Sequence, residues 1–369
     1  MSALPIDSGT KDLSAKAGTP VIFRGDGEPN SPGTMLLRLA DAEVEIGFEP
    51  DSYSLGGNVK ELEDRFALML GKESAIFMPT GTLANHLAIR ALCGNNPRAI
   101  VQEQSHLYND SGDCVTQLSG INLIPLAKGK PYFTLKELQE AVAESSLGRV
   151  SNPVGAMMIE SPVRRQMGQV VPFGEMEAIT ALCRDQGIGA HLDGARLYMM
   201  SAASGIEPRE YAALFDTVYV SLYKYFGAPF GAILAGDSQV IDGMFHTRRM
   251  FGGGLASAYF AAALALRGIE GFSARFEASM LKARELFKRL NTLPGIDIKE
   301  FDHGSNIFPL RIAPGVDVER LIESLHQRSV FVYPDEAAGI VSSLTVNTTL
   351  LTQSNEVIFQ AFREALNAS

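Results

Sequence analysis

Short apolar runs alternate with amphipathic segments through the middle of the chain. Seven runs are mostly apolar, at residues 75–78, 99–102, 121–124, 156–159, 188–192, 217–220 and 231–234. Between several of them, as at residues 173–186, apolar positions recur at helical spacing. Apolar strands separated by helices predict an α/β fold with a largely parallel, seven-stranded sheet covered on both faces. Ligands of such sheets bind beyond the carboxyl ends of the strands, so candidate chemistry is expected there.

A different pattern follows the glycine triplet at 252–254. Helical spacing predicts helices at 256–266, 275–290, 318–328 and 355–366, with an interruption at 268–271 and two or three strands from residue 296 onward. We therefore predict three parts. Residues 1–55 form an N-terminal arm with one short helix, packed on the rest or on a partner subunit; residues 56–269 form a large domain and 270–369 a small α/β domain.

A turn of small residues joins the first apolar run to a helical segment at 83–92. The turn contains Thr80, Gly81 and Thr82. Such a turn presents free backbone N–H groups and the positive end of the helix dipole, which suits a phosphate, and the threonines add hydroxyl donors. The same residues also fit an ordinary strand–helix turn in which Thr80 or Thr82 is the N-cap.

Two polar residues follow later apolar runs. His106 comes after the run at 99–102, where its ring can lie against a flat heteroaromatic cofactor, although it also fits an ordinary polar loop. Asp193 closes the run at 188–192, and a carboxylate there costs several kcal/mol to bury unless it meets a cation. A protonated pyridine nitrogen would be such a cation. The alternative is a local ion pair between Asp193 and Arg196.

Lys224 follows the run at 217–220 and lies between two tyrosines. Burial at a strand end would lower the pKa of this lysine, because desolvation disfavours the charged amine. An amine that loses its proton easily suits Schiff-base chemistry. A lone lysine here would also fit a surface side chain whose stem lies along apolar neighbours.

Each of these segments alone allows an ordinary structural role, but together they indicate one cofactor. A phosphate turn, a flat-ring residue, a carboxylate and a lysine occur in that order at strand ends of one sheet. This order predicts pyridoxal 5′-phosphate (PLP) bound to Lys224 through a Schiff base.

Composition narrows the class of protein. The chain has 369 residues, too many for one ordinary core, with 46% hydrophobic and 20% charged residues, which excludes general disorder. A net charge of −10 argues against nonspecific nucleic-acid binding. No run approaches the roughly 20 apolar residues that cross a bilayer, and the N-terminus lacks a secretory signal. The three cysteines form no CxxC pair, which argues against a disulfide framework or zinc site and favours a cytoplasmic protein.

The same motifs resemble a known family over roughly residues 20–350. The matching segments are Pro79-Thr-Gly-Thr82, His106, His191-Leu-Asp-Gly-Ala-Arg-Leu197, Lys224-Tyr-Phe-Gly-Ala-Pro229 and Gly252-Gly-Gly254. They are similar to the low-specificity threonine aldolases of the β-eliminating lyase group. The resemblance implies the PLP-dependent transferase fold of aspartate aminotransferase, and a homodimer or homotetramer with active sites at subunit interfaces.

The resemblance also implies roles for individual residues. Thr80, Gly81 and Thr82 would hold the phosphate, His106 would stack on the ring, Asp193 would pair with the ring nitrogen and Lys224 would form the Schiff base. Arg196 would lie near the substrate carboxylate and the ring hydroxyl. Arg248 or Arg249 would reach the phosphate, and Tyr53 would be contributed by a neighbouring subunit.

Three departures from the family pattern concern the substrate. The family begins with Arg-Ser-Asp, whose serine helps to bind the carboxylate, and this chain has Gly25 at the serine position. Ser343 stands where the family has a carboxylate-binding arginine, and Leu255-Ala-Ser257 replaces Met-Arg-Gln. Because an arginine–carboxylate bond is charge-assisted and bidentate, its loss should weaken binding. Either Arg164 or Arg165 substitutes, or the substrate is not a typical α-amino acid.

The family implies retro-aldol cleavage of a β-hydroxy-α-amino acid to glycine and an aldehyde, with His106 as the base for the hydroxyl proton. Because two residues expected to bind the substrate carboxylate are missing, another reaction of the same cofactor stays open, namely β-elimination, racemisation or transamination. A third alternative is a homologue that binds the cofactor without turnover.

Overall fold

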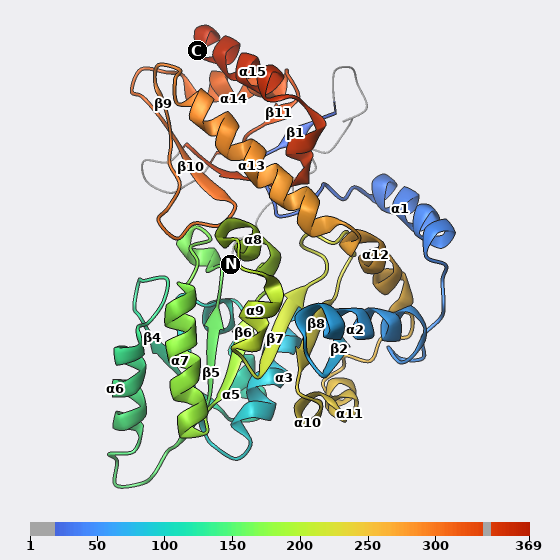
Figure 1. Cartoon of the computed structure of the whole chain (residues 1–369), viewed down its shortest axis with the longest axis vertical. Coiled ribbons are helices and arrows are strands. Elements are labelled where there is room, and N and C mark those ends of the chain that lie inside the picture. The colour runs from blue at the N-terminus through green and yellow to red at the C-terminus, as the bar shows by residue number, and fades with distance from the viewer. Residues whose placement is uncertain (1–18, 335–340) are drawn as a thin grey trace.

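The computed structural model describes residues 19–334 and 341–369 (Figure 1). A body built around the large sheet contains most of the chain, and a smaller region formed by C-terminal elements lies at one end of it. The helices are α1 (Pro32–Glu45), α2 (Gly57–Leu70), α3 (Gly81–Cys93), α4 (His106–Asn109), α5 (Cys114–Ser119), α6 (Leu135–Ser145), α7 (Phe173–Gln186), α8 (Leu197–Ser204), α9 (Pro208–Ala213), α10 (Ser238–Ile241), α11 (Met244–Met250), α12 (Tyr259–Ile269), α13 (Phe272–Leu290), α14 (Val318–His326) and α15 (Asn355–Ala368). Two 3-10 helices are η1 (Arg164–Gln166) and η2 (Thr348–Thr352).

All seven predicted apolar runs form strands of one sheet. The strands are β2 (Ser74–Met78), β3 (Arg98–Gln102), β4 (Asn122–Leu126), β5 (Val154–Glu160), β6 (Gly189–Asp193), β7 (Thr217–Ser221) and β8 (Ala232–Gly236). Their order is β2-β8-β7-β6-β5-β3-β4, and only β8 runs antiparallel to its neighbours. The predicted largely parallel sheet is therefore confirmed, and six of its seven strands end at the same edge.

Helices cover both faces of the sheet, which explains why its strands are apolar throughout. Along β5, Met158 packs in a cluster with Ile89 of α3, whereas Ile159 packs in a cluster with Met176 of α7. Successive side chains of a strand point to opposite faces, so α3 and α7 lie on opposite sides. Among the described residues, no helix is both long and apolar enough to span a bilayer.

The C-terminal region has its own small sheet. Its strands β9 (Ile296–Ile298), β10 (Ile307–Ile312) and β12 (Ser342–Thr345) are antiparallel, in the order β12-β10-β9. The N-terminal strand β1 (Val21–Ile22) pairs in parallel with β11 (Val330–Phe331), so residues from both ends of the chain meet there. Helix α1 contacts α12. The division at residues 55 and 269 stays a prediction.

The predicted interruption at 268–271 is wrong in part. Helix α12 continues through Gly268 to Ile269, and the break is confined to Glu270 and Gly271, whose φ is +60°. Gly268 has a packing role instead, because a Cβ there would lie 1.8 Å from the backbone oxygen of Phe226. The glycine therefore lets α12 approach the chain just after Lys224.

We expect Gly268→Ala to destabilise the protein strongly, because Phe226 offers a backbone atom that cannot move aside. The free energy of unfolding should fall by about 2 kcal/mol or more despite the higher helix propensity of alanine. Gly174→Ala in α7 is the matched control, since nothing lies within 4 Å of its Cβ position. Urea unfolding should show it unchanged or stabilised by up to about 1 kcal/mol. Equal stabilities of the two variants would contradict this packing.

Candidate active site

Side chains that follow four strands meet at the shared edge of the sheet. They line a cavity of about 340 Å³ together with residues from neighbouring loops. The lining residues are Pro79, Thr80, Gly81, Thr82, His106, Glu160, Arg164, Asp193, Ala195, Arg196, Tyr219, Tyr223, Lys224, Pro229, Phe230 and Gly231. The resemblance gives a role to ten residues; seven of them are in this set, and Tyr53, Arg248 and Arg249 are not.

The turn after β2 is an N-cap turn, one of the two roles that its sequence allows. Thr80 is the N-cap of α3, and its hydroxyl accepts a hydrogen bond from the Leu83 N–H at 3.1 Å. Gly81 and Thr82 lie in the first turn, whose N–H groups have no acceptor within the helix. A Cβ on Gly81 would lie 2.0 Å from the Tyr219 hydroxyl, so only glycine fits there. The turn is suited to a phosphate at the wall of the cavity.

Asp193 is a buried carboxylate held by neutral donors. Its Oδ2 accepts from Asn85 Nδ2 at 2.6 Å, and its Oδ1 accepts from the Ala195 N–H at 3.1 Å. The local pair with Arg196 is not formed; Arg196 Nε instead donates to Asp26 Oδ2 at 2.8 Å. A buried carboxylate with neutral donors fits a cationic ligand group such as a protonated ring nitrogen.

Lys224 lies in the turn after β7, where it is half-buried and lines the cavity. Burial, assisted by the nearby Arg196, lowers the pKa of Lys224 to about 8. The segment after Asp26 crosses directly over this turn, because a Cβ on Gly27 would lie 2.7 Å from the Lys224 backbone oxygen. The lysine is therefore held in a closely packed turn with an amine that loses its proton easily.

Glu160 is a site residue that the sequence analysis missed. It pairs in register with Asp193 on the adjacent strand and is buried. Its Oε2 accepts from the His106 N–H at 2.5 Å, and its Oε1 accepts from the Arg164 N–H at 2.9 Å. Burial and the charge of Asp193 raise the pKa of this carboxyl. Its sequence signal was present, since Glu160 closes an apolar run in the same way as Asp193.

His106 is the first residue of α4, so Glu160 fixes the backbone from which its ring enters the cavity. Burial lowers the pKa of His106, which favours the neutral imidazole near pH 7. Ring atom Nδ1 lies 3.2 Å from the Ser111 hydroxyl. A neutral ring of this kind can both cover a flat ligand and accept a proton.

Arg248 and Arg249, one of which was predicted to contact the phosphate, both lie outside the cavity lining. Arg248 is fully buried and donates to the backbone oxygens of Phe77, Ser54 and Tyr53 at 2.6, 3.1 and 3.3 Å. Its role within this chain is to tie the 53–54 turn to the end of β2. The exposed Arg249 stacks on the ring of Tyr53, with its guanidinium carbon 4.2 Å from the ring centre.

All three departures from the family pattern, at Gly25, Ser343 and residues 255–257, lie outside the cavity lining. Gly25 has a φ of +78°, and its carbonyl accepts from Asn347 Nδ2 at 3.0 Å. The Ser343 hydroxyl lies 3.7 Å from the sulfur of Met167. Of the two candidate substitutes, Arg164 lines the cavity, whereas Arg165 makes a two-point contact with Asp110.

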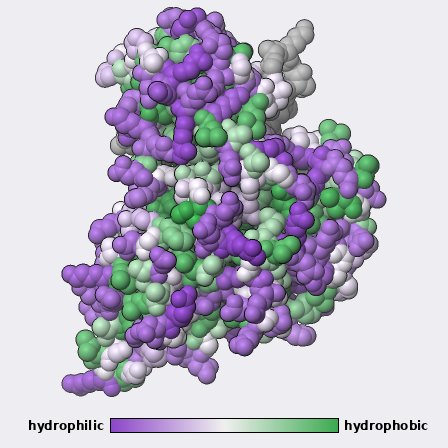
Figure 2. Space-filling model, in the orientation of Figure 1, coloured by the Kyte–Doolittle hydropathy of each residue, from purple (hydrophilic) through white to green (hydrophobic). Residues whose placement is uncertain are grey.

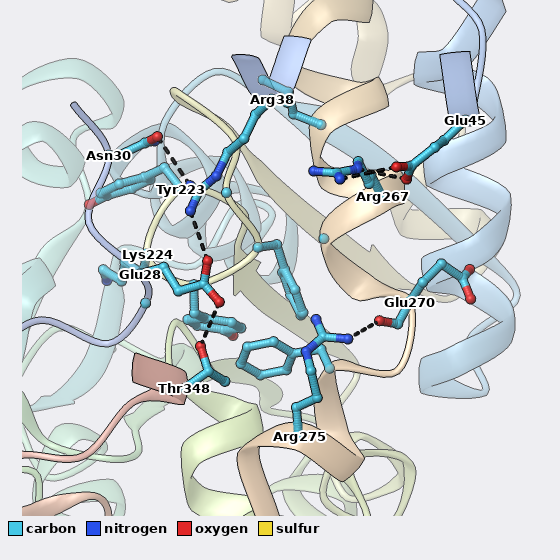
Figure 3. A pocket seen from close by; sticks show the side chains of 17 residues that line it. Glu28, Asn30, Arg38, Glu45, Tyr223, Lys224, Arg267, Glu270, Arg275 and Thr348 are labelled. Atoms are coloured by element: carbon cyan, nitrogen blue, oxygen red, sulfur yellow. Dashed lines mark hydrogen bonds and ion pairs between the residues drawn. The ribbon is translucent and has the colours of Figure 1, made fainter. Parts of the chain in front are cut away.

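A larger cavity of about 450 Å³ shares Tyr223 and Lys224 with the first (Figure 3). Four of the charged groups on its rim form two ion pairs. Arg38 binds Glu28 at 2.8 Å, and Arg267 binds Glu45 at 2.7 Å. The smaller cavity, by contrast, brings together Asp193, Glu160, His106 and Lys224. Among the described residues, no cluster of three or more His, Cys, Asp or Glu side chains could hold a metal ion.

Known proteins that resemble this chain were found both by sequence and by structure. The profile of the β-eliminating lyase family matches residues 30–313. A solved structure from Listeria monocytogenes, described as a proposed L-allo-threonine aldolase, superimposes with a TM-score of 0.78 at 28% identity over 93% of this chain and 95% of that one.

Two curated relatives match over a shorter stretch. The low-specificity L-threonine aldolase of Candida albicans is 28% identical over 67% of this chain, and the alanine racemase TOXG of Cochliobolus carbonum is 30% identical over 69%. Each alignment spans 66% of the relative, just under two thirds of its length. The predicted fold, that of the aspartate aminotransferase group of PLP enzymes, is confirmed. The chain belongs to the β-eliminating lyase family.

Proposed function

We propose that the protein is a PLP-dependent lyase that cleaves a β-hydroxy-α-amino acid to glycine and an aldehyde. The observation that carries the proposal is the meeting of the Gly81 turn, His106, Asp193 and Lys224 in one cavity. The family membership and the relatives described as threonine aldolases support it.

The residues present fit this cofactor. The N–H groups of Gly81 and Thr82 would hold its phosphate, Asp193 would face its ring nitrogen, and His106 would cover its ring. The amine of Lys224 would bind it covalently. When bound, PLP supplies a carbonyl that captures amines and an electron sink for bonds broken at Cα.

The remaining groups would orient the amino acid. Arg196 uses Nε for Asp26, which leaves its two terminal nitrogens for the substrate carboxylate. Arg164 lies across the cavity and would take the second carboxylate contact that the family pattern assigns to other positions. The neutral His106 would accept the β-hydroxyl proton as the Cα–Cβ bond breaks.

A second candidate is another reaction of the same cofactor, with racemisation foremost. The residues that bind the substrate carboxylate decide which bond at Cα stands perpendicular to the ring. Two of the positions where the family has such residues are Gly25 and Ser343 in this chain. Likeness to a relative described as an alanine racemase also favours it.

Assembly and location follow from the same proposal. We infer a cytoplasmic homodimer or homotetramer with sites at the subunit interface, to which Tyr53 and Arg249 of a neighbour would contribute. Helix α1 supports this, since Leu36, Leu37 and Val44 on it are 69%, 70% and 87% exposed. Figure 2 shows apolar side chains among polar ones at the outer edge of this helix.

The first test is covalent cofactor binding. Incubation with PLP should give a visible absorption band, and borohydride reduction should fix the cofactor on the peptide that contains Lys224. Lys224→Ala should lose both signals, because no other amine is placed in the cavity by the described residues. Lys136→Ala, at an exposed lysine, is the control and should keep both. A wild-type protein that stays colourless would overturn the proposal.

The lowered pKa of Lys224 predicts a distinct pH profile in the cofactor-free protein. Only the neutral amine reacts, so its labelling by an amine-reactive reagent should rise as pH increases through about 8 and then level off. Below pH 8 the rate should fall by about tenfold per unit. The exposed Lys136 should keep rising toward pH 10, near the ordinary lysine pKa of about 10.4. Peptide mass spectrometry measures both, and parallel profiles would refute the shift.

A substrate panel separates the two candidate reactions. With threonine, allo-threonine and phenylserine, the lyase should release glycine and the matching aldehyde. A keto acid with ammonia would instead indicate β-elimination, and loss of optical activity from L-alanine without an aldehyde would indicate racemisation. Absence of aldehyde from every β-hydroxy amino acid contradicts the lyase, even where PLP is bound.

A further inference from the structure

A chain of buried polar side chains runs behind Asp193, away from the cavity. Asn85 Nδ2 lies 2.6 Å from Asp193 Oδ2, and Asn85 Oδ1 lies 2.9 Å from His191 Nε2. His191 Nδ1 in turn lies 2.8 Å from the Thr217 hydroxyl. All four residues are buried, and the chain joins α3, β6 and β7.

The direction of each hydrogen bond follows from the acceptor at its end. An ionised carboxylate only accepts, so Asn85 must turn its NH₂ group toward Asp193 and its oxygen toward His191. His191 Nε2 must therefore carry the hydrogen. Burial lowers the pKa of His191 to about 4, so the ring is neutral and its Nδ1 accepts from the Thr217 hydroxyl. Every donor in the chain points toward Asp193.

The polar side chains of this chain lie next to apolar residues. On the sheet-facing side of α3, the neighbours Ala84, Leu87 and Ala88 pack in an apolar cluster. Polar side chains in such a place cost free energy unless each one has a partner. A line of three polar side chains that ends on one carboxylate restricts the direction in which that carboxylate accepts hydrogen bonds.

We propose that Asn85, His191 and Thr217 are positioning residues that set the acceptor strength and direction of Asp193 toward the ring nitrogen of PLP. The inference rests on the proposed function. It assigns the protonation of the bound ring to a three-residue hydrogen-bond chain rather than to Asp193 alone.

Thr217 provides the sharpest test because it is the far end of the chain. With valine at this position, His191 Nδ1 has only the Thr217 backbone oxygen, at 3.2 Å, which is an acceptor. The ring would move its hydrogen to Nδ1, and the bare Nε2 would then face the Asn85 oxygen. To avoid two facing acceptors the amide turns over, and Asp193 loses its donor.

The experiment follows the ring nitrogen directly. Holoenzyme is prepared with PLP labelled with ¹⁵N in the ring, and its NMR shift is measured for wild type, Asn85→Leu, Thr217→Val and Thr217→Ser. The wild-type signal should lie in the protonated range. Asn85→Leu and Thr217→Val should move it toward the unprotonated range, and Asn85→Leu should raise the Kd for PLP by about tenfold. Thr217→Ser keeps the hydroxyl and should match wild type.

A second measurement needs no cofactor. In the apoprotein labelled with ¹⁵N-histidine, His191 should carry its hydrogen on Nε2 in wild type and on Nδ1 in Thr217→Val. Valine is close in shape to threonine, so Thr217→Val should fold like the wild type. This measurement therefore does not depend on whether Asn85→Leu folds.

The outcomes separate the two proposals. Failure of the wild type to bind PLP overturns the proposed function and the inference with it. Normal PLP binding with the same ring-nitrogen signal in wild type, Asn85→Leu and Thr217→Val overturns only the inference. A wild-type His191 that carries its hydrogen on Nδ1 also overturns it, whether or not PLP binds.

Discussion

The burial of one carboxylate, that of Asp193, determines how the centre of this protein is built. A carboxylate removed from water needs donors or a cation nearby. The protein provides an amide and a backbone N–H and leaves the side toward the cavity for a ligand. Arg196 is turned away by Asp26, so it cannot neutralise Asp193 in advance. Asp193 therefore lines the cavity without an ion-pair partner among the described residues.

A second carboxylate, that of Glu160, holds two of the loops around the cavity. Glu160 lies beside Asp193 on the neighbouring strand and binds the backbone of His106 and Arg164. One side chain therefore fixes the entry angles of two loops that contribute the ring and a guanidinium to the cavity. The two carboxylates have separate tasks, since one faces the ligand and the other holds the loops that surround it.

The sequence predicted most of the fold because the strands are apolar on both faces. Helix α7 was predicted with its observed bounds, since Pro172 and Gly187 mark its two ends. Glu160 and Asn85 escaped prediction for different reasons. The first ends a strand without a recognised motif, and the second lies inside a helix, where only the packing of α3 on β6 reveals its contact with Asp193.

Contacts between residues distant in sequence could not be predicted either. No local pattern connects Arg196 with Asp26, or Arg248 with the backbone at Tyr53. These contacts depend on how loops close in three dimensions, which periodicity and turn signals do not describe. The prediction that the pKa of Lys224 is lowered at a strand end needed no such information, because the apolar run before it was sufficient.

The link between Asn347 and the N-terminal segment has a consequence for biosynthesis. Its side-chain amide donates to the backbone oxygens of Ile22 and Gly25, holding the segment that carries Asp26. A ribosome makes Ile22 first and Asn347 325 positions later. The segment that carries Asp26, the buried partner of Arg196, therefore receives this anchor only after residue 347 has been made. The last strand of the large sheet ends at Gly236, so all of its strands are made before this anchor exists.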